Sequence, residues 1–362
     1  MTNLLQQYFP MIRTREEILK EIHEKGHLQR IFYEWQEEQQ EEFLNFCTGV
    51  KGVKMMYDFM IKEILDPSAV PDRVNELLSL ILGQKVKIID VLPNDGTRIA
   101  DEFSLLIMDM VVQLEDGSIV DLEIQKIGYM FPGERSACYS ADLLLRQYRR
   151  VRNELKKANK KFSYKNIKPV YTIILFETSP ALFHKFPEEY MHSFEQKSDT
   201  GVEMNLLQKY IFIPLDIFKS IQHNKDDMMK IENRLEAWLA FLCMDEPENI
   251  IAIIEKYPDF KDMYEQVYDV CQNLEEVMGM FSKELLELDR NTVQLMIDEM
   301  AKELENLKTE NQEKEQTILV QSKKLTEKDQ TISAKNEELT EKNQRIIELL
   351  KKVEELEKNV KA

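Results

Sequence analysis

Polar side chains interrupt two strongly apolar segments of this 362-residue sequence. Asp109 lies inside the run from Leu105 to Leu114, and Glu123 and Gln125 lie in the run that begins at Ile119. A carboxylate inside an apolar strand costs stability unless something pairs with it. Carboxylates on adjacent strands can hold Mg²⁺ (or Mn²⁺) against a phosphate, where the ion polarises the phosphoryl oxygen and supplies hydroxide. Asp109 and Glu123 fit the role of metal ligands, and Gln125 fits that of a group that orients water.

The register of the two runs decides whether these side chains meet. Glu115-Asp116-Gly117 separates the runs and is typical of a hairpin loop with glycine at positive φ. If the loop has these three residues, Asp109 lies opposite Glu123, and alternation puts Gln125 on the same face. A two-residue turn at Asp116-Gly117 would put Asp109 on the other face. The metal hypothesis therefore depends on the longer loop, and a polar surface face is the alternative.

A basic segment follows the hairpin. Residues 146–168 hold ten Lys or Arg and one acid, Glu154, although the whole chain has a formal net charge of −18. This excess is typical of a patch that binds the DNA backbone without sequence preference, and a solvated helix end explains it equally well. The candidate DNA-binding cations are Arg146, Arg149, Arg150, Arg152, Lys156 and Lys157.

Composition excludes several other classes of protein. The acidic balance argues against a protein that coats nucleic acid generally, but it allows binding at a local basic patch. The four cysteines form no CxxC pair and the five histidines form no HxxxH pair, so no zinc signature is present. No apolar run approaches the length of a membrane span, and no signal peptide opens the chain. We expect a soluble cytoplasmic protein with no membrane segment.

Periodicity predicts the elements around the hairpin. Thr14 and Glu17 form a capping box for a helix to about Lys25, and a second helix is expected from Leu28 to Phe46. Strands are predicted near 85–92, at 170–176 and at 210–214, the last at a sheet edge because of Pro214. The order of elements predicts an α/β core with a mixed sheet.

The basic segment begins within a helix that is predicted over 134–157 and extends past its end. The expected inward side chains are Ala137, Ala141, Leu144, Leu145 and Tyr148.

Near the C-terminus, apolar residues recur every seven positions without Gly or Pro. They are Leu304, Ile318, Leu325, Ile332, Leu339, Ile346, Val353 and Val360. This spacing predicts a coiled coil that joins copies of the chain into a homo-oligomer. The second core position is mostly Lys or Gln, so the coiled coil is expected to be weak in its middle, and a lone solvated helix is the alternative.

The span from about Cys47 to Trp238 resembles the PD-(D/E)XK nuclease superfamily, and specifically its recombination-promoting nuclease and putative transposase family. The matching pieces are Tyr57-Asp58-Phe59, Asp109, the motif DGSIVDLEIQK at 116–126, the residues from Arg135 to Tyr139, the strand VYTIILF and the later EAWLAFL. The resemblance implies a mixed sheet flanked by helices, with Asp109 and Glu123 as magnesium ligands. Gln125 stands where the superfamily has lysine, and this departure puts the cleavage rate in question.

The resemblance also implies further site residues. Some members add an acid from the first helix, for which Glu76 is the first candidate and Asp58 the second, although a solvated helix residue is the simpler explanation of Glu76. Arg135 and Tyr139 either contact phosphate or cap and pack the helix that they open.

Together these observations predict a restriction-endonuclease-like α/β fold with helical additions at both ends. The expected segments are an N-terminal helical cap (1–50), a nuclease-like core (51–222), a helical region (223–300) and a coiled coil (301–362). The predicted function is magnesium-dependent DNA hydrolysis associated with transposition or recombination. The alternative is a catalytically degenerate protein that binds DNA or acts as an oligomeric scaffold.

Overall fold

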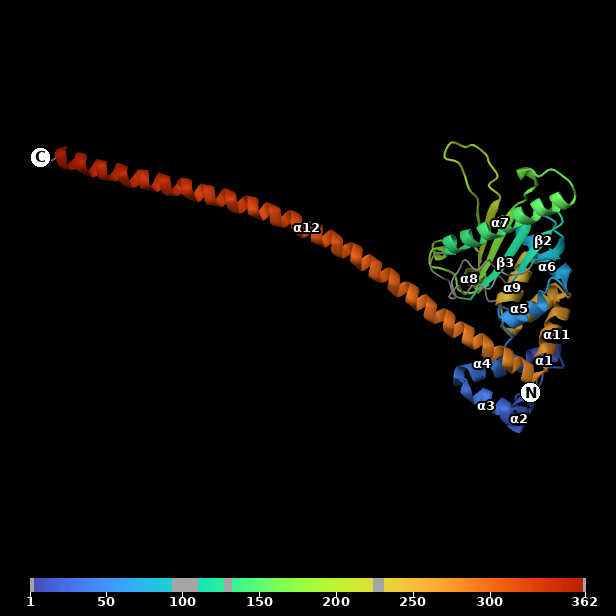
Figure 1. Cartoon of the computed structure of the whole chain (residues 1–362). Helices are drawn as coiled ribbons and strands as arrows, with labels where there is room; N and C mark the ends of the chain where they lie inside the picture. Colours follow the sequence, from blue (N-terminus) through green and yellow to red (C-terminus); the bar gives the residue numbers. More distant parts are fainter. Residues whose placement is uncertain (1–2, 93–109, 127–131, 224–230, 361–362) are drawn as a thin grey trace. The chain divides into compact units, whose positions relative to one another are not determined.

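The computed structural model describes residues 3–92, 110–126, 132–223 and 231–360 (Figure 1). The chain divides into two compact units, residues 1–295 and 296–362. The described strands are β1 (Ile88–Val91), β2 (Met110–Leu114), β3 (Ile119–Gln125), β4 (Val170–Phe176), β5 (His192–Phe194) and β6 (Gln208–Pro214). The described α-helices are α1 (Leu4–Tyr8), α2 (Arg15–Glu24), α3 (Gly26–Glu34), α4 (Glu37–Cys47), α5 (Asp58–Ile64), α6 (Pro71–Leu82), α7 (Pro132–Lys157), α8 (Leu215–His223), α9 (Arg234–Cys243), α10 (Pro247–Lys256), α11 (Phe260–Val270) and α12 (Leu274–Val360). The finer division at residues 50, 222 and 300 stays a prediction.

The strands form one mixed six-stranded sheet in the order β1-β2-β3-β4-β6-β5. Strands β3, β4 and β6 are parallel, whereas β1, β2 and β5 pair antiparallel to their neighbours. The prediction of a mixed α/β sheet is confirmed. The prediction that 210–214 lies at an edge is wrong, because β6 lies between β4 and β5. Pro214 is the last residue of β6, where its missing N–H does not interrupt the ladder.

The β2–β3 hairpin has the three-residue loop 115–117. The amide of Leu114 donates to the Ser118 carbonyl at 2.9 Å, and the amide of Gly117 donates to the Leu114 carbonyl at 2.9 Å. Gly117 has φ +88°, which glycine adopts without a steric penalty. The strand register pairs Met110 with Leu122 and continues residue by residue toward the loop. The predicted register is therefore confirmed over the described residues.

The two faces of the sheet pack against different layers. Val120 and Leu122 of β3 face the large core that also holds buried side chains of α4, α6, α9 and α12. Ile119, two residues from Asp121, faces the other way and packs with Leu143 of α7. Helix α7 crosses this second face of the sheet (Figure 1). The hairpin strand β3 is thus covered on both faces, and the odd-numbered residues of β3 lie under α7.

The N-terminal helices confirm one prediction and correct another. Thr14 caps α2 through its reciprocal contacts with Glu17, as predicted. The single helix expected over 28–46 is instead two helices, α3 and α4. Trp35 is extended with ψ 152°, and Gln36 starts α4 with a capping box of its own. This polar capping interaction offers the backbone an alternative to a continuous helix.

Residues 296–360 of the second unit belong to the last helix, α12, which is 87 residues long in all. The heptad residues from Leu304 to Val353 are exposed, for example Ile318 at 64% and Leu325 at 60%. No helix within the described ranges is both long and apolar enough to cross a membrane.

Candidate active site

Strand β3 carries the described part of the predicted site. Glu123 and Gln125 alternate with Leu122 and Ile124, so both point to the α7 face of the sheet. Asp109 lies outside the described residues. The register that would set it opposite Glu123 is the observed one, but the pairing itself stays a prediction.

The site residues on β3 are buried in the protein interior. Glu123 is 1% exposed, Gln125 is 3% exposed and Asp121 is fully buried. Gln125 Nε2 donates to Glu123 Oε2 over 3.5 Å, which is the upper limit for a hydrogen bond, so this contact is weak. On the neighbouring strand the register puts Thr172, also buried, beside Asp121. Polar groups therefore form a continuous buried row on this face of the sheet.

Helix α7 covers this row with polar side chains. Its buried residues are Ser136, Ser140, Leu143 and Gln147. The predicted inward face was wrong, because Ala137, Ala141 and Leu145 are exposed, while Leu144 and Tyr148 are half-buried. The helix is rotated relative to the prediction because the sheet beneath it presents polar groups as well as apolar ones.

Specific hydrogen bonds fix α7 over the sheet. Gln147 is fully buried; its Nε2 donates to the Gly117 carbonyl at 3.1 Å, and its Oε1 accepts from the Lys168 amide at 2.8 Å. Ser140 Oγ accepts from Gln208 Nε2 at 3.2 Å. Gln147 thus joins α7 both to the hairpin loop and to the residues that lead into β4.

The donor types suit a hard divalent cation. Glu123 offers carboxylate oxygens, and the side-chain carbonyl of Gln125 is buried and accepts no hydrogen bond from any residue that the structure describes. Oxygen donors of this kind are the ligands that Mg²⁺ and Mn²⁺ prefer. Within the described residues, no three His, Cys, Asp or Glu side chains gather so that they could hold a metal ion. The site fits such a cation in chemistry, and its predicted second carboxylate is Asp109.

The candidate DNA-binding cations fall into two groups on α7. Arg146 pairs with Asp142 at 2.6 Å and Arg150 lies 3.9 Å from Glu154, and both arginines are half-buried. The exposed cations are Arg149, Arg152, Lys156 and Lys157. In the described part of the chain, no ion pair joins any of these four to a carboxylate. Their charge is therefore available to an external anion.

Arg135 and Tyr139 lie on the first turns of α7 and are half-buried. Tyr139 packs against the apolar cluster of Val111, Ile119, Leu143 and Val170, while the Nε atom of Arg135 is buried in the interior. These placements are consistent with a packing role, and a phosphate contact stays a prediction.

The two candidate additional acids are occupied elsewhere. Glu76 on α6 accepts from Arg234 at 2.7 and 3.0 Å and from Trp238 Nε1 at 3.2 Å, so both its oxygens have donors. Asp58 at the start of α5 pairs with Lys62.

Lys126 follows Gln125 but points away from it, as alternation requires, and pairs with buried Glu284 on α12. It therefore does not replace the lysine that the superfamily has at the position of Gln125.

A further, half-buried carboxyl lies beside the end of β3. The Glu177 amide donates to the Gln125 carbonyl at 2.8 Å. Burial raises the pKa of the Glu177 carboxyl, and the charges of Lys54 and Lys126 oppose that rise. Glu177 therefore adds a polar group next to the end of β4.

Sequence reasoning missed part of this interior. It did not select Asp121, Thr172, Ser136 or Gln147, all of which are buried. A signal for Asp121 was available, because it alternates with Glu123 and Gln125 along one strand. The polar spacing 136, 140, 147 on α7 was the corresponding signal in the helix.

Comparison with known families gives one match. A family model described as PD-(D/E)XK nuclease family transposase matches residues 55–293, roughly two thirds of the chain. This span includes the sheet, the hairpin and α7. Comparisons with curated proteins and with solved structures give no match.

Proposed function

Because this chain belongs to the PD-(D/E)XK nuclease family transposases, we propose that it hydrolyses DNA phosphodiester bonds with a divalent metal ion. The observation that carries the proposal is the buried pair of Glu123 and Gln125 beneath a helix whose exposed cations form no ion pair within the described residues. A metal ion bound between Glu123 and Asp109 would be held by carboxylate oxygens, the ligands that Mg²⁺ prefers. We also propose that the six-stranded core is of the restriction-endonuclease type.

Each residue then has a defined task. Asp109 and Glu123 would hold Mg²⁺ or Mn²⁺, which when bound polarises the phosphoryl oxygen and lowers the pKa of water. The Gln125 amide would hold the attacking water in line with the phosphorus. Gln125 carries no charge, so it orients water without stabilising the anionic transition state as a lysine would.

The exposed cations of α7 would bind the DNA backbone. Arg149, Arg152, Lys156 and Lys157 are exposed and spaced over about two turns of helix. Their binding would be electrostatic and independent of base sequence. We assign the carboxylate ligands to Asp109 and Glu123 and not to Glu76, because both oxygens of Glu76 already accept hydrogen bonds.

Oligomerisation through the C-terminal helix is the remaining part of the proposal. Exposed Leu304, Ile318 and Leu339 repeat on one heptad position of α12, a pattern that a coiled coil between copies would bury. Two joined copies could engage two DNA strands or two DNA ends. Chains cut after Glu303 should then be monomeric in light scattering. If the number of copies per particle were the same as for the full chain, this part would be refuted.

The deciding experiment is a plasmid assay. Supercoiled DNA incubated with the full chain should be nicked in Mg²⁺ or Mn²⁺ and left intact in EDTA. Asp109→Ala should abolish nicking while binding to DNA persists.

Gln125 in place of lysine favours a second function, that of a degenerate nuclease fold that only binds DNA. Binding without any cleavage in either metal would establish this second function and refute the first.

A further inference from the structure

Three aromatic rings lie together where the basic helix α7 ends. Tyr148 of α7 stacks with Tyr164 at a centroid distance of 6.2 Å and an interplanar angle of 14°. Phe162 stands edge-on to both rings, 5.4 Å from Tyr148 and 5.3 Å from Tyr164. We call these three residues the aromatic platform. None of them belongs to the buried core clusters of the described residues.

The chain holds the aromatic platform in place from both sides. Asn159 has φ +52°, and the Lys160 amide donates to the Leu155 carbonyl at 2.8 Å, so the chain turns back at the end of α7. Tyr164 then opens a short 3₁₀ turn capped by Ser163 and Asn166. These contacts order Phe162 and Tyr164 before any ligand binds.

Gln147 fixes the far end of the returning segment. Its Oε1 accepts the Lys168 amide at 2.8 Å, and Ile167 beside that amide is 9% exposed. The segment between Asn159 and Lys168 is therefore attached to α7 at both ends.

The outer ring of the aromatic platform is open to solvent. Tyr164 is 74% exposed, the highest value among the large apolar and aromatic residues of the described chain. Phe162 and Tyr148 are half-buried beside it. A stack of rings that ends in an exposed tyrosine resembles the surfaces on which bases of single-stranded nucleic acid stack.

The segment that carries the aromatic platform is rich in cations. Arg152 lies over the Tyr148 ring at 5.9 Å and donates from Nη1 to the Tyr148 hydroxyl at 3.0 Å. Residues 155–168 contain no Asp or Glu. The exposed lysines of this segment are Lys156, Lys157, Lys160, Lys161, Lys165 and Lys168. Exposed aromatic rings within a positive surface are the two elements that single-stranded nucleic-acid binding requires.

Exposure of a tyrosine alone would not support this conclusion. Tyr33 of α3 is 56% exposed, but it stacks on His23 and its hydroxyl contacts the His23 ring at 3.0 Å. Residues 15–41 around it contain eight Asp or Glu and four Lys or Arg. Tyr164 differs because it ends a stack of aromatic rings inside a positively charged segment.

We propose that the aromatic platform stacks an unpaired nucleobase, so that the preferred DNA substrate has a single-stranded segment next to the bonds that α7 contacts. The proposal rests on the proposed DNA-binding function of α7, and it specifies the class of substrate. Bases in a duplex are already stacked on each other, so the aromatic platform adds affinity only for unpaired nucleotides. The stacking is tolerant of base identity because every base has a π-face.

The test compares three probes that carry the same number of phosphates. Fluorescence anisotropy in EDTA would measure binding of the full chain to an oligothymidylate of about 16 nucleotides, the upper end of known site sizes. An abasic deoxyribose-phosphate strand of equal length removes the bases, and a duplex of equal phosphate number pairs them. Tyr164→Ala should weaken oligothymidylate binding about tenfold and leave the other two probes unchanged.

Further variants separate stacking from charge and from unfolding. Tyr164→Trp should retain the affinity for oligothymidylate, and Tyr33→Ala is the matched control that should change nothing. Tyr164→Ala should leave the salt dependence of binding unchanged, because no phosphate contact is lost. Equal affinity of wild type and Tyr164→Ala for oligothymidylate, or an equal loss on all three probes, would overturn the proposal.

Two outcomes distinguish this inference from the proposed nuclease activity. Because EDTA prevents cleavage, a failure to cut plasmid leaves the binding result intact. The same measurement with an oligouridylate tests whether the bound strand is DNA or RNA. If Tyr164→Ala weakened binding to this RNA only, the assignment to DNA would be overturned.

Discussion

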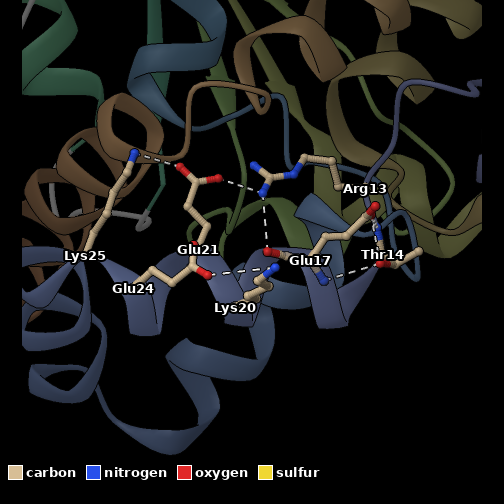
Figure 2. Close-up of polar contacts among 7 residues, drawn as sticks. All are labelled: Arg13, Thr14, Glu17, Lys20, Glu21, Glu24 and Lys25. Carbon is tan, nitrogen blue, oxygen red and sulfur yellow. Dashed lines mark hydrogen bonds and ion pairs between the residues drawn. The ribbon is translucent and has the colours of Figure 1, made fainter.

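Two helical regions of this protein contain the same types of charged residue but differ in whether those residues form ion pairs. On and around α2, basic and acidic side chains pair with each other (Figure 2). Arg13 contacts Glu21 at 2.6 Å, Lys25 contacts Glu21 at 2.8 Å and Lys20 lies 3.8 Å from Glu24. The Lys25 hydrogen bond is the main cause that lowers the pKa of Glu21, with Arg13 adding to it.

The outer face of α7 carries cations without such partners. Arg149, Arg152, Lys156 and Lys157 are exposed, and in the described residues none forms an ion pair. Self-repulsion between these charges costs stability, so their concentration is better explained by an external anion than by folding. The comparison shows that a structural surface differs from a binding surface in whether its charged side chains pair with each other, and not in how many charges it carries.

The sharpest contrast between the regions concerns buried Glu123 and half-buried Glu21. Glu123→Gln keeps the size of a buried side chain but removes its charge, so it should lower the rate of metal-dependent plasmid nicking at least about a hundredfold. The matched control is Glu21→Gln, the same change in the paired region, which should leave nicking unaffected. Gel assays of nicked product over time measure both rates. Equal rates for Glu123→Gln and wild type would remove Glu123 from the site.

Neutralising the outer face of α7 tests its role directly. Changing Arg149, Arg152, Lys156 and Lys157 to Gln should reduce the slope of log affinity against log salt for duplex DNA by up to about 3.6. The control changes Arg13, Lys20 and Lys25 to Gln, which removes positive charges that have carboxylate partners. Anisotropy titrations at several salt concentrations give the slopes. The same slope for both variants would show that α7 has no special relation to DNA.

Gln147, a neutral residue within the basic helix α7, should contribute more to the free energy of unfolding than its charged neighbours do. Gln147→Leu would leave the Gly117 carbonyl and the Lys168 amide without their buried partner, at a cost of about 2 kcal/mol in the free energy of unfolding. Asn153→Leu on the same helix is the control, since Asn153 is exposed. Urea unfolding followed by circular dichroism compares the two variants. A loss as large for Asn153→Leu would mean that the buried hydrogen bonds are not the cause.

Gln147 also shows where prediction from sequence stops. The hairpin register was predictable because Glu115-Asp116-Gly117 permits few loop geometries, and the observed loop has these residues. The inward face of α7 was not, because hydrophobic periodicity favoured Leu145, which is exposed. The helix turns its polar side chains toward a sheet whose own buried groups are polar, and that tertiary requirement is absent from the local pattern. The position of Asp109 stays a prediction.

The paired region should show a modest and specific loss of its own. Thr14 accepts from the Glu17 amide, while Glu17 accepts from the Thr14 amide at 2.8 Å (Figure 2). Thr14→Ala should lower the free energy of unfolding by about 1 kcal/mol, and Thr14→Ser should restore most of it. Thermal unfolding measures both. DNA affinity should stay unchanged in either variant, and a change would contradict the separation of the two regions.

The smallest expected effect is the pH dependence of the paired region. Because the folded protein lowers the pKa of Glu21, its ionised carboxylate stabilises the fold above the ordinary carboxyl pKa of about 4.3. This contribution is lost as pH falls through the lowered pKa, since the carboxylate must then be protonated and its pairs with Lys25 and Arg13 break. Glu21→Gln should therefore show a shallower decline in unfolding free energy between neutral and acidic pH than wild type. Urea titrations across that range provide the comparison, and DNA affinity at neutral pH should be equal in both proteins. An identical pH profile would mean that the ion pairs of α2 are as weakly coupled to folding as the unpaired cations of α7.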